Sequence, residues 1–569
     1  MNKNWLIVCT MTIGIFLCML DTTVMNIALP AIEQGLNISL NSLSWALNVY
    51  TISFACLTIP LGQIADRFGR NRIYLLGLSI FVLGSLISGS ASTIVFLVAG
   101  RAFQSIGAAI VFPASMTIGL TTVTLQQRTK AVTLLGVTQG LAAALGPTIG
   151  GIVTTLIGWR WVFLINLPLG LVAIGLCLWL LPMRQSNNAP VKQIDLLGML
   201  LSMLMLFSLT VTLIYGKQWG WHSPSVAGLA ILALVSFNLF IIVERHNSSP
   251  MVPLQLFKKH QFSGAAVALI VSQILMVGVS VIMPTFLTHI QGQTELGAAL
   301  IITPMSVMIF ITAPISGSLL DKLGPRLLTF TGMTFLAAGY LLFSFMNPAQ
   351  YWQLISGCIV LGSGFGIIAG PLMVLGAANF TGTMLTASQS VLGVIKQIGT
   401  LLAVAIFVSA LTGNIQVAKK TAITDVDHYT RTLPVPRETQ VKIATAATTK
   451  IKDGGDSGQT AKTPTTQHIS RQQVDQLVAQ QSKKVIQAAG GNQLPSTVKH
   501  QIKAQVRRKV YTIINRDQRI IDRASKHIAA NTKRLLVTAF FKPYRYALPV
   551  AIAAISVAFC FEKKHPVKN

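Results

Sequence analysis

An acidic residue, Asp21, stands in the middle of an apolar stretch, FLCMLDTTVMNIALP, that covers residues 16–30. A carboxylate in hydrocarbon costs about 2.5–3.5 kcal/mol on insertion scales, so a retained one indicates a function. Burial favours the neutral form of a carboxyl group, which would let Asp21 take up and release protons or neutralise a cationic ligand. The alternative is a structural role, in which Asp21 bonds to neighbouring helices together with Thr22 and Thr23.

Two basic residues also stand inside apolar stretches, Arg101 in 95–119 and Lys396 in 386–411. Arg101 is expected to face other helices, because an unpaired guanidinium in lipid is strongly unfavourable. One possible role for it is to bond carbonyl groups and pin helices together. Lys396 could line a cavity, or it could bond backbone carbonyls; we do not expect it to carry protons.

A charged pattern, G-x-x-x-D-[RK]-x-G followed within two residues by arginine, occurs twice, as GQIADRFGR from residue 62 and as GSLLDKLGPR from residue 317. Glycine permits close helix contact, and the charges could clamp a helix end in one conformation and release it in another. The alternative is a tight turn with interfacial charges. The predicted gating residues are Gly62, Asp66, Arg67, Gly69, Arg70, Gly317, Asp321, Gly324 and Arg326.

These residues must be positioned by membrane helices. The chain has 569 residues, of which 52% are hydrophobic and only 11% are charged. Soluble domains carry roughly 25% charge, so this composition predicts an all-α integral membrane protein. Fourteen apolar segments are long enough to span a bilayer: 5–30, 43–63, 73–92, 95–119, 131–157, 161–181, 196–215, 225–243, 263–288, 298–320, 327–346, 352–374, 386–411 and 546–561.

The repeated pattern divides these segments into six, two and six. Both copies follow a span, the second and the tenth, so the ninth span would repeat the first. Repeated bundles of this kind are the architecture of rocking transporters. The expected parts are a six-helix bundle (1–182), two linking helices (183–262), spans nine to thirteen (263–411), an insertion (412–545), and span fourteen with a tail (546–569).

Lys and Arg in the short links predict the orientation. With the N-terminus in the cytoplasm, the inner side carries sixteen of these residues and the short outer links only Arg160 and Lys217. Positive residues concentrate on the inner side, so both termini are expected to be cytoplasmic. The composition is typical of a bacterial plasma membrane protein.

The insertion, 412–545, is strongly basic, with 24 Lys and Arg against 8 Asp and Glu. The parity of the spans places it outside the cell. Its first half contains a predicted flexible linker, KIKDGGDSGQTAKTPTTQ, and its second half has the spacing of amphipathic helices. It could be a solvated helical hairpin, or it could contact anionic lipid headgroups or wall polymers. Nucleic acid is not an expected partner.

Glycines and a proline recur in span five, in GVTQGLAAALGPTIGG (136–151). Their four-residue spacing suits close helix contact, and a proline permits a bend. Helix packing alone could explain them. The residues concerned are Gly136, Gly140, Gly146, Pro147, Gly150 and Gly151.

Together these motifs resemble the fourteen-helix drug:proton antiporter branch of the major facilitator superfamily, the EmrB/QacA-like group. LDTTVMNIALPAI (20–32), RAFQSIGAA (101–109), the span-five stretch and WRWVFLINLPLG (159–170) are similar to its successive motifs, although Ser105 stands where glycine is usual. The resemblance implies the major-facilitator fold and proton-coupled efflux. It also implies that Arg101 tunes protonation of Asp21, and that span five seals the two halves against each other.

Polar and aromatic residues inside the spans could contact a substrate. A large apolar cavity with few polar anchors suits lipophilic ligands, often cationic ones if Asp21 faces them. Taken singly, most of these residues are as well explained by helix–helix bonding. They are Asn26, Trp45, Asn48, Tyr50, Gln139, Gln273, Gln389, Lys396 and Gln397.

Enzymatic and ATP-driven functions are not expected. The sequence contains no phosphate-binding G-x-x-x-x-G-K-[ST] loop, and nothing in it suggests a catalytic cluster, a metal site or a cofactor. The expected function is therefore export of toxic amphipathic compounds, driven by a proton gradient through alternating access in a monomer. The alternatives are export of an endogenous lipid, peptide or metabolite by the same fold, and a non-transporting membrane scaffold or sensor.

Overall fold

The computed structural model describes residues 2–38, 40–124, 127–182, 195–247, 250–377, 380, 382–453, 471–489, 491 and 495–561. Within these ranges the chain is helical and contains no β-strand. The helices of the first part are α1 (Lys3–Leu36), α2 (Leu40–Phe68), α3 (Arg70–Gly89), α4 (Ile94–Thr122), α5 (Arg128–Leu156), α6 (Trp161–Leu164), α7 (Asn166–Leu180), α8 (Leu196–Trp219) and α9 (Pro224–His246).

The second part follows a short helix and repeats long apolar helices. Its elements are α10 (Gln255–Lys258), α11 (His260–Thr285) with a π-helical turn (Phe286–Ile290), α12 (Glu295–Leu323), α13 (Pro325–Phe345), α14 (Tyr351–Ala377), α15 (Gly382–Arg431), α16 (Arg437–Asp453), α17 (Arg471–Ala488) and α18 (Ser496–Ala553), which continues as a 3-10 helix (Ala554–Cys560).

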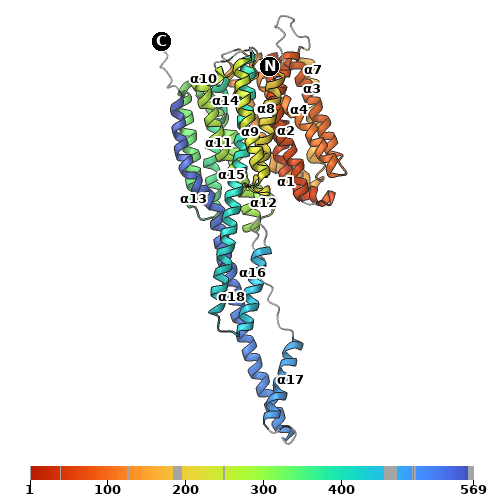
Figure 1. The fold of residues 1–569 in the computed structure, drawn as a ribbon, viewed down its shortest axis with the longest axis vertical. Coiled ribbons are helices and arrows are strands. Elements are labelled where there is room, and N and C mark those ends of the chain that lie inside the picture. The colour runs from red at the N-terminus through yellow and green to blue at the C-terminus, as the bar shows by residue number, and fades with distance from the viewer. Residues whose placement is uncertain are drawn as a thin grey trace. The chain divides into compact units, whose positions relative to one another are not determined.

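Thirteen helices of the described chain are long and apolar enough to cross a membrane. They correspond to thirteen of the fourteen predicted spans. The remaining predicted span, 131–157, is covered by α5, a helix of 29 residues. The predicted class, an all-α integral membrane protein, is therefore confirmed. Figure 1 shows the long helices of the membrane-spanning part lying side by side.

Two compact units share the chain. The first comprises residues 1–288, 293–410 and 541–569, and contains the apolar bundle. The second comprises residues 289–292 and 411–540. The predicted tail and the link at 183–194 lie outside the described residues, apart from residue 561.

Helical structure extends further than predicted on both sides of the insertion. Span thirteen is the first part of a 50-residue helix, α15, that ends at Arg431 instead of near residue 411. Residues 437–453 form α16, so the first four residues of the predicted flexible linker are helical; positions 454–470 lie outside the described residues. Neither extension contains a proline, and alanine, lysine and glutamine in them favour a helix in water, whereas the hydropathy of a span marks only its membrane part.

The second unit has a small apolar core of its own. Ala422, Val426 and Ile528 are buried together with Ala447 and Ile451, which α16 contributes. Leu433, Val435 and Ala524 form a neighbouring cluster. The periodic apolar residues of α15, α16 and α18 thus have buried partners in this unit.

Close helix contacts within the bundle depend on glycine. A Cβ on Gly84 of α3 would meet the backbone of Gln104 on α4, and a Cβ on Gly107 of α4 would meet the backbone of Phe81 on α3. These two reciprocal contacts bring α3 and α4 together at backbone distance, and they fix the position of Gln104.

Candidate functional site

The Asp21 carboxylate lies at the centre of a buried polar network. Its Oδ2 atom is paired with the guanidinium Nη1 of Arg101, and both side chains are about 1% exposed. Gln104 Nε2 donates a hydrogen bond to Asp21 Oδ1 at 2.7 Å, and Asn166 Nδ2 donates to the same oxygen at 3.2 Å. Asp21 therefore neither faces lipid nor stands unpaired.

Further contacts hold the Arg101 guanidinium in place. Nη1 donates to Gln104 Oε1 at 2.8 Å, and Nε donates to the carbonyl oxygen of Ala46 at 3.4 Å. The Tyr50 ring centroid lies 4.2 Å from Arg101 Cζ, which is a cation–π distance. Arg101 thus bonds both a backbone carbonyl of α2 and the carboxylate of α1.

Four helices supply the network. Asp21 is on α1 and Arg101 and Gln104 are on α4, one turn apart and so on one face. Ser85 on α3 accepts hydrogen bonds from Gln104 Nε2 at 2.7 Å and from Asn166 Nδ2 at 3.3 Å. Asn166 is the first residue of α7. All five side chains are buried, so every charge and most of the dipoles are satisfied inside the bundle.

Sequence reasoning missed Gln104, Ser85 and Asn166. Gln104 lies within the RAFQSIGAA motif and Asn166 within WRWVFLINLPLG, so both were present in stretches already singled out. The signal that could have identified these residues is their polarity inside an apolar helix. Their contact with Asp21 depends on how α4 and α7 pack against α1, which no spacing in the sequence specifies.

The first gating motif contacts the first part of α15. Arg70 Nε lies 2.6 Å from Asp66 Oδ1, and Arg70 Nη2 donates to the carbonyl oxygen of Gly382 at 3.1 Å. Gly62 faces Ser390 on the same helix. Arg67 lies beside the neighbouring Phe68 ring, at 5.6 Å.

The second motif makes an equivalent contact with α5. A Cβ on Gly317 would meet the side chain of Thr133. Gly69 and Gly324, which separate α2 from α3 and α12 from α13, both have positive φ, 99° and 79°. Arg326 lies over the Phe559 ring at 4.6 Å. The side chain of Asp321 lies outside the described part of the structure.

The span-five glycines face two different neighbours. Gly136 and Gly140 approach the second half, at Gly370 of α14 and Ile309 of α12, whereas Gly146 and Gly150 face Thr23 and Val24 of α1. Only the first half of α5 therefore uses glycine to contact the other bundle. Gly151 is half-buried, and the Pro147 side chain lies outside the described residues.

The predicted substrate residues do not gather in one place. Trp45 and Asn48 contact Tyr215 on α8, at a ring distance of 4.9 Å and a hydrogen bond of 3.1 Å. Tyr50 belongs to the ion-pair network. Gln397 is half-buried, and the Asn26 side chain is not described.

A second group of the predicted residues does come together around α15. Lys396 Nζ donates to Gln139 Oε1 at 2.6 Å, and Gln273 Nε2 donates to Thr400 Oγ1 at 3.1 Å. Gln273 Oε1 has no hydrogen-bond partner in the described chain. The same holds for Gln139 Nε2 and Gln389 Nε2, although both residues are buried.

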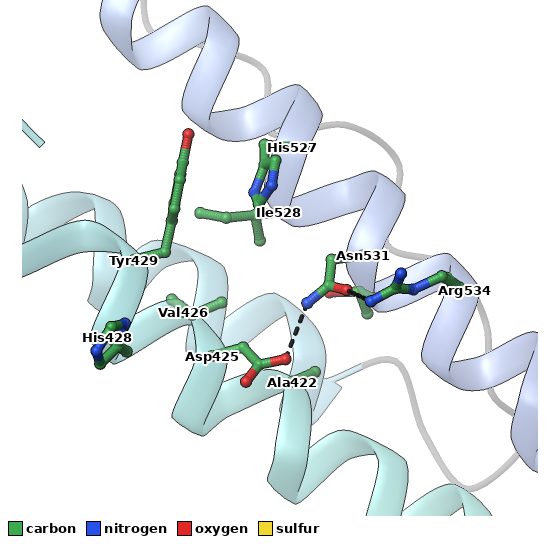
Figure 2. A pocket seen from close by; sticks show the side chains of 10 residues that line it. Ala422, Asp425, Val426, His428, Tyr429, His527, Ile528, Asn531 and Arg534 are labelled. Carbon is green, nitrogen blue, oxygen red and sulfur yellow. Dashed lines mark hydrogen bonds between the residues drawn. The ribbon is translucent and has the colours of Figure 1, made fainter. Parts of the chain in front are cut away.

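A separate pocket of about 310 Å³ lies in the second unit. Figure 2 shows its two walls, with Tyr429 and Asp425 on α15 and His527 and Asn531 on α18. The Tyr429 and His527 rings stack at 4.3 Å, and Asn531 Nδ2 donates to Asp425 Oδ2 at 2.9 Å. No group of three or more possible metal ligands occurs among the described residues.

Comparison with known proteins identifies the family. The family model described as Major Facilitator Superfamily matches residues 11–404. The multidrug transporter protein MdtP of Bacillus subtilis is 31% identical over 66% of this chain and 69% of its own length. The methylenomycin A resistance protein of Bacillus subtilis is also 31% identical, over 70% of this chain and 85% of its own length.

A third relative is the multidrug resistance protein Stp of Mycobacterium tuberculosis, 28% identical over 78% of this chain and 81% of its own length. The matched region contains the Asp21 network, both gating motifs and the α5 glycines. Major facilitators are transporters rather than enzymes, and the helices found here have the length and composition that such a transporter needs. The chain therefore belongs to the major facilitator superfamily.

Proposed function

We propose that this protein is a proton-coupled exporter of amphipathic, lipophilic toxic compounds, and that it works by alternating access. The observation that carries the proposal is the Asp21–Arg101 pair, which puts one titratable carboxylate and its counter-charge inside the lipid-spanning bundle. The names of the relatives, two multidrug proteins and one methylenomycin A resistance protein, support efflux. The proton gradient supplies the energy for export, so the proposal includes no cofactor.

Proton exchange requires the ion pair to open. In the conformation described here Asp21 and Arg101 are about 1% exposed, so neither face supplies a proton to the carboxylate. When α1 moves relative to α4, the carboxylate loses its counter-charge and binds a proton, because an unpaired buried charge is costly. Arg101 keeps the Tyr50 ring and the Gln104 amide as partners. Closure then restores the pair and releases the proton.

Alternating access is supported by where the two halves meet. Gly62 faces Ser390, Gly317 faces Thr133, and Gly140 faces Ile309, all in the part of the bundle near the gating motifs. We infer that these contacts close the cytoplasmic side. Breaking them would open a path to the cytoplasm.

The available energy is sufficient for export. One proton crossing about 100 mV yields about 2.3 kcal/mol. Half a pH unit adds about 0.7 kcal/mol. The total of about 3 kcal/mol supports roughly a 150-fold gradient of a neutral substrate exchanged one for one.

Reconstituted protein tests the proposal. Proteoliposomes that contain a pH-sensitive dye should show proton movement when a lipophilic drug is added outside, and Asp21→Asn should abolish it. Glu33→Gln is the matched control, because Glu33 is an acidic residue of α1 outside the network, and it should leave the signal intact. Unchanged proton movement in Asp21→Asn would refute the assignment of Asp21.

The proposal also covers the membrane location, the orientation and the oligomeric state of the protein. We propose that the protein lies in a bacterial plasma membrane, with both termini in the cytoplasm and residues 412–545 outside, and that the monomer suffices for transport. The asymmetry of Lys and Arg between the short links supports this orientation.

We also propose that the insertion binds an anionic polymer of the cell envelope. Six exposed basic side chains recur at intervals of three, four or seven residues along α18, which places them on one helix face. They extend over 24 residues, about 36 Å of helix. Such a linear array suits a linear polyanion. The six residues are Lys509, Arg516, Arg519, Arg523, Lys526 and Lys533.

Binding of the full-length protein to poly(glycerol phosphate) tests this second proposal. Replacing Arg516, Arg519 and Arg523 by glutamine should weaken binding about tenfold at low salt, because counter-charges are removed from one stripe. Replacing Lys419, Lys420 and Lys450 by glutamine removes the same charge elsewhere and should have a smaller effect. Equal effects, or binding only to phosphatidylglycerol vesicles, would contradict the proposal.

A further inference from the structure

The only charged residue that the sequence places inside the spans of the second half is Lys396. Between residues 263 and 411 the acidic residues are Glu295 and Asp321, which lie near the two ends of α12. The remaining basic residues there, Lys322 and Arg326, belong to the gating motif. In the first half, Asp21 is already neutralised by Arg101. Within the apolar spans of the two halves, Lys396 is therefore a positive charge with no ion-pair partner among the described residues.

Lys396 lies where the two halves meet. It is half-buried on α15, and its ammonium donates to Gln139 Oε1 on α5 at 2.6 Å. The Phe112 ring of α4 lies 5.9 Å from Nζ. No ion pair of Lys396 is found among the described residues. A lysine has three donors, so the bond to Gln139 leaves further donors available.

Two buried amides have unused donors, Gln139 in contact with Lys396 and Gln389 on the same helix as Lys396. Gln139 is 6% exposed and Gln389 is 3% exposed, and the Nε2 group of each lacks a hydrogen-bond partner in the described chain. Gln389 precedes Lys396 by seven residues, so the two share one face of α15 about 10 Å apart. Buried polar groups in proteins are normally satisfied, so orphaned donors indicate an acceptor that belongs to something else.

The aromatic ring of Phe112 lies beside the same face of α15. Gly393 lies between Gln389 and Lys396 on the same face, and a Cβ there would be 3.5 Å from the Phe112 ring. The absence of a side chain at Gly393 leaves the ring next to this face of α15. An aromatic ring beside a helix face that carries an ammonium group and an amide with an unused donor fits a ligand with an aromatic body and an anionic end.

We infer that Lys396, Gln139 and Gln389 form a subsite for the carboxylate of an amphipathic substrate, whose aromatic part lies on Phe112. This inference rests on the proposed export function and changes the expected charge of the substrate. The sequence predicts often cationic ligands because Asp21 could face them. In the structure that carboxylate is enclosed with Arg101, and the charge exposed to the interface between the halves is positive. Lys396 would repel a cation and attract an anion.

Three probes with the same aromatic body test the charge preference. Fluorescence titration of the full-length protein in detergent compares pyrenebutanoate, pyrenebutanol and pyrenebutyl-trimethylammonium. Wild type should bind the carboxylate about tenfold more tightly than the ammonium compound, since one charge-assisted hydrogen bond is worth that much. Lys396→Gln should remove the preference and leave binding of the alcohol unchanged, whereas Lys396→Arg should retain it. Gln389→Leu should weaken carboxylate binding alone.

Lys420→Gln is the matched control, because it removes a lysine of α15 that lies beyond the apolar segment 386–411. It should keep the preference of wild type. The inference is overturned if wild type binds the ammonium probe as tightly as the carboxylate, if it binds none of the probes, or if Lys396→Gln weakens all three equally. Proton-driven export of pyrenebutanol in proteoliposomes is a separate readout. Its absence, with the binding preference intact, would refute the export proposal and leave the subsite standing.

Discussion

The Cβ of Ser390 lies 3.7 Å from the position that a Cβ on Gly62 would take. These residues belong to α2 in the first half and α15 in the second, so the distance measures how closely the halves approach beside the first gating motif. Disulfides have Cβ–Cβ separations of about 3.5–4.5 Å. The geometry of this pair is therefore suitable for a cross-link.

The double variant Gly62→Cys/Ser390→Cys should form a disulfide under mild oxidation and stop transport. The bond would hold the two halves together, and reduction should restore activity. Mass spectrometry of the cross-linked peptide and a transport assay check both parts. The single variants are the controls, and continued transport by the oxidised double variant would show that this contact does not open.

Removing Arg101 alone should be more harmful than removing the whole pair. Arg101→Leu leaves the buried Asp21 carboxylate without its counter-charge, at a cost of about 3–5 kcal/mol in the free energy of unfolding. Asp21→Leu/Arg101→Leu removes both charges and should recover most of that stability, without restoring coupled proton movement. Thermal unfolding in detergent measures the first effect. A double variant as unstable as the single one would contradict it.

Gln104 should contribute to stability although no motif assigned it a role. Gln104→Leu leaves Asp21 Oδ1 with Asn166 and removes an acceptor from Arg101, at an expected cost of about 1–3 kcal/mol. Ser105→Ala is the comparison, because the Ser105 hydroxyl donates only within its own helix turn, to the carbonyl oxygen of Ala102. Its expected effect on the unfolding temperature is small. Equal shifts for the two variants would contradict the prediction.

Span fourteen should be anchored by one tyrosine. Tyr544 is fully buried, and its ring lies within 6.3 Å of the rings of Tyr340, Phe343, Phe407 and Phe541.

Tyr544→Ala should therefore cost about 3–5 kcal/mol, as other aromatic truncations in cores do. Tyr546→Ala, two residues further along, removes a ring that is 64% exposed and should cost far less. Unfolding of the two variants in detergent gives the comparison, and similar losses would refute the role of Tyr544.

The fold could be predicted from the sequence because hydropathy and the placement of lysines are properties of whole segments rather than of single residues. Every predicted span has a helix, and the repeated glycine–aspartate pattern marks the two equivalent turns, at Gly69 and Gly324. A membrane requires internally satisfied backbones, so apolar length alone determines the helical class. The continuation of α15 to Arg431 could not be predicted in this way, because it lies beyond the apolar segment.

The candidate site was only partly predictable. Asp21 and Arg101 could be singled out because charge inside an apolar segment is unusual. Their polar partners could not, since Gln104 on α4 and Asn166 on α7 meet the Asp21 carboxylate of α1 only once these helices have packed together. The pocket at Tyr429 and His527 had no sequence signal, because its two walls are about a hundred residues apart and meet only through folding.

Gly62 meets α15 and Gly317 meets α5, so the closure that we propose for the cytoplasmic side would have two contact points related by the repeated motif. If both contacts hold the same closed state, each is partly redundant. We expect damage to one contact to produce leakage of substrate rather than complete loss of transport, because the other contact remains.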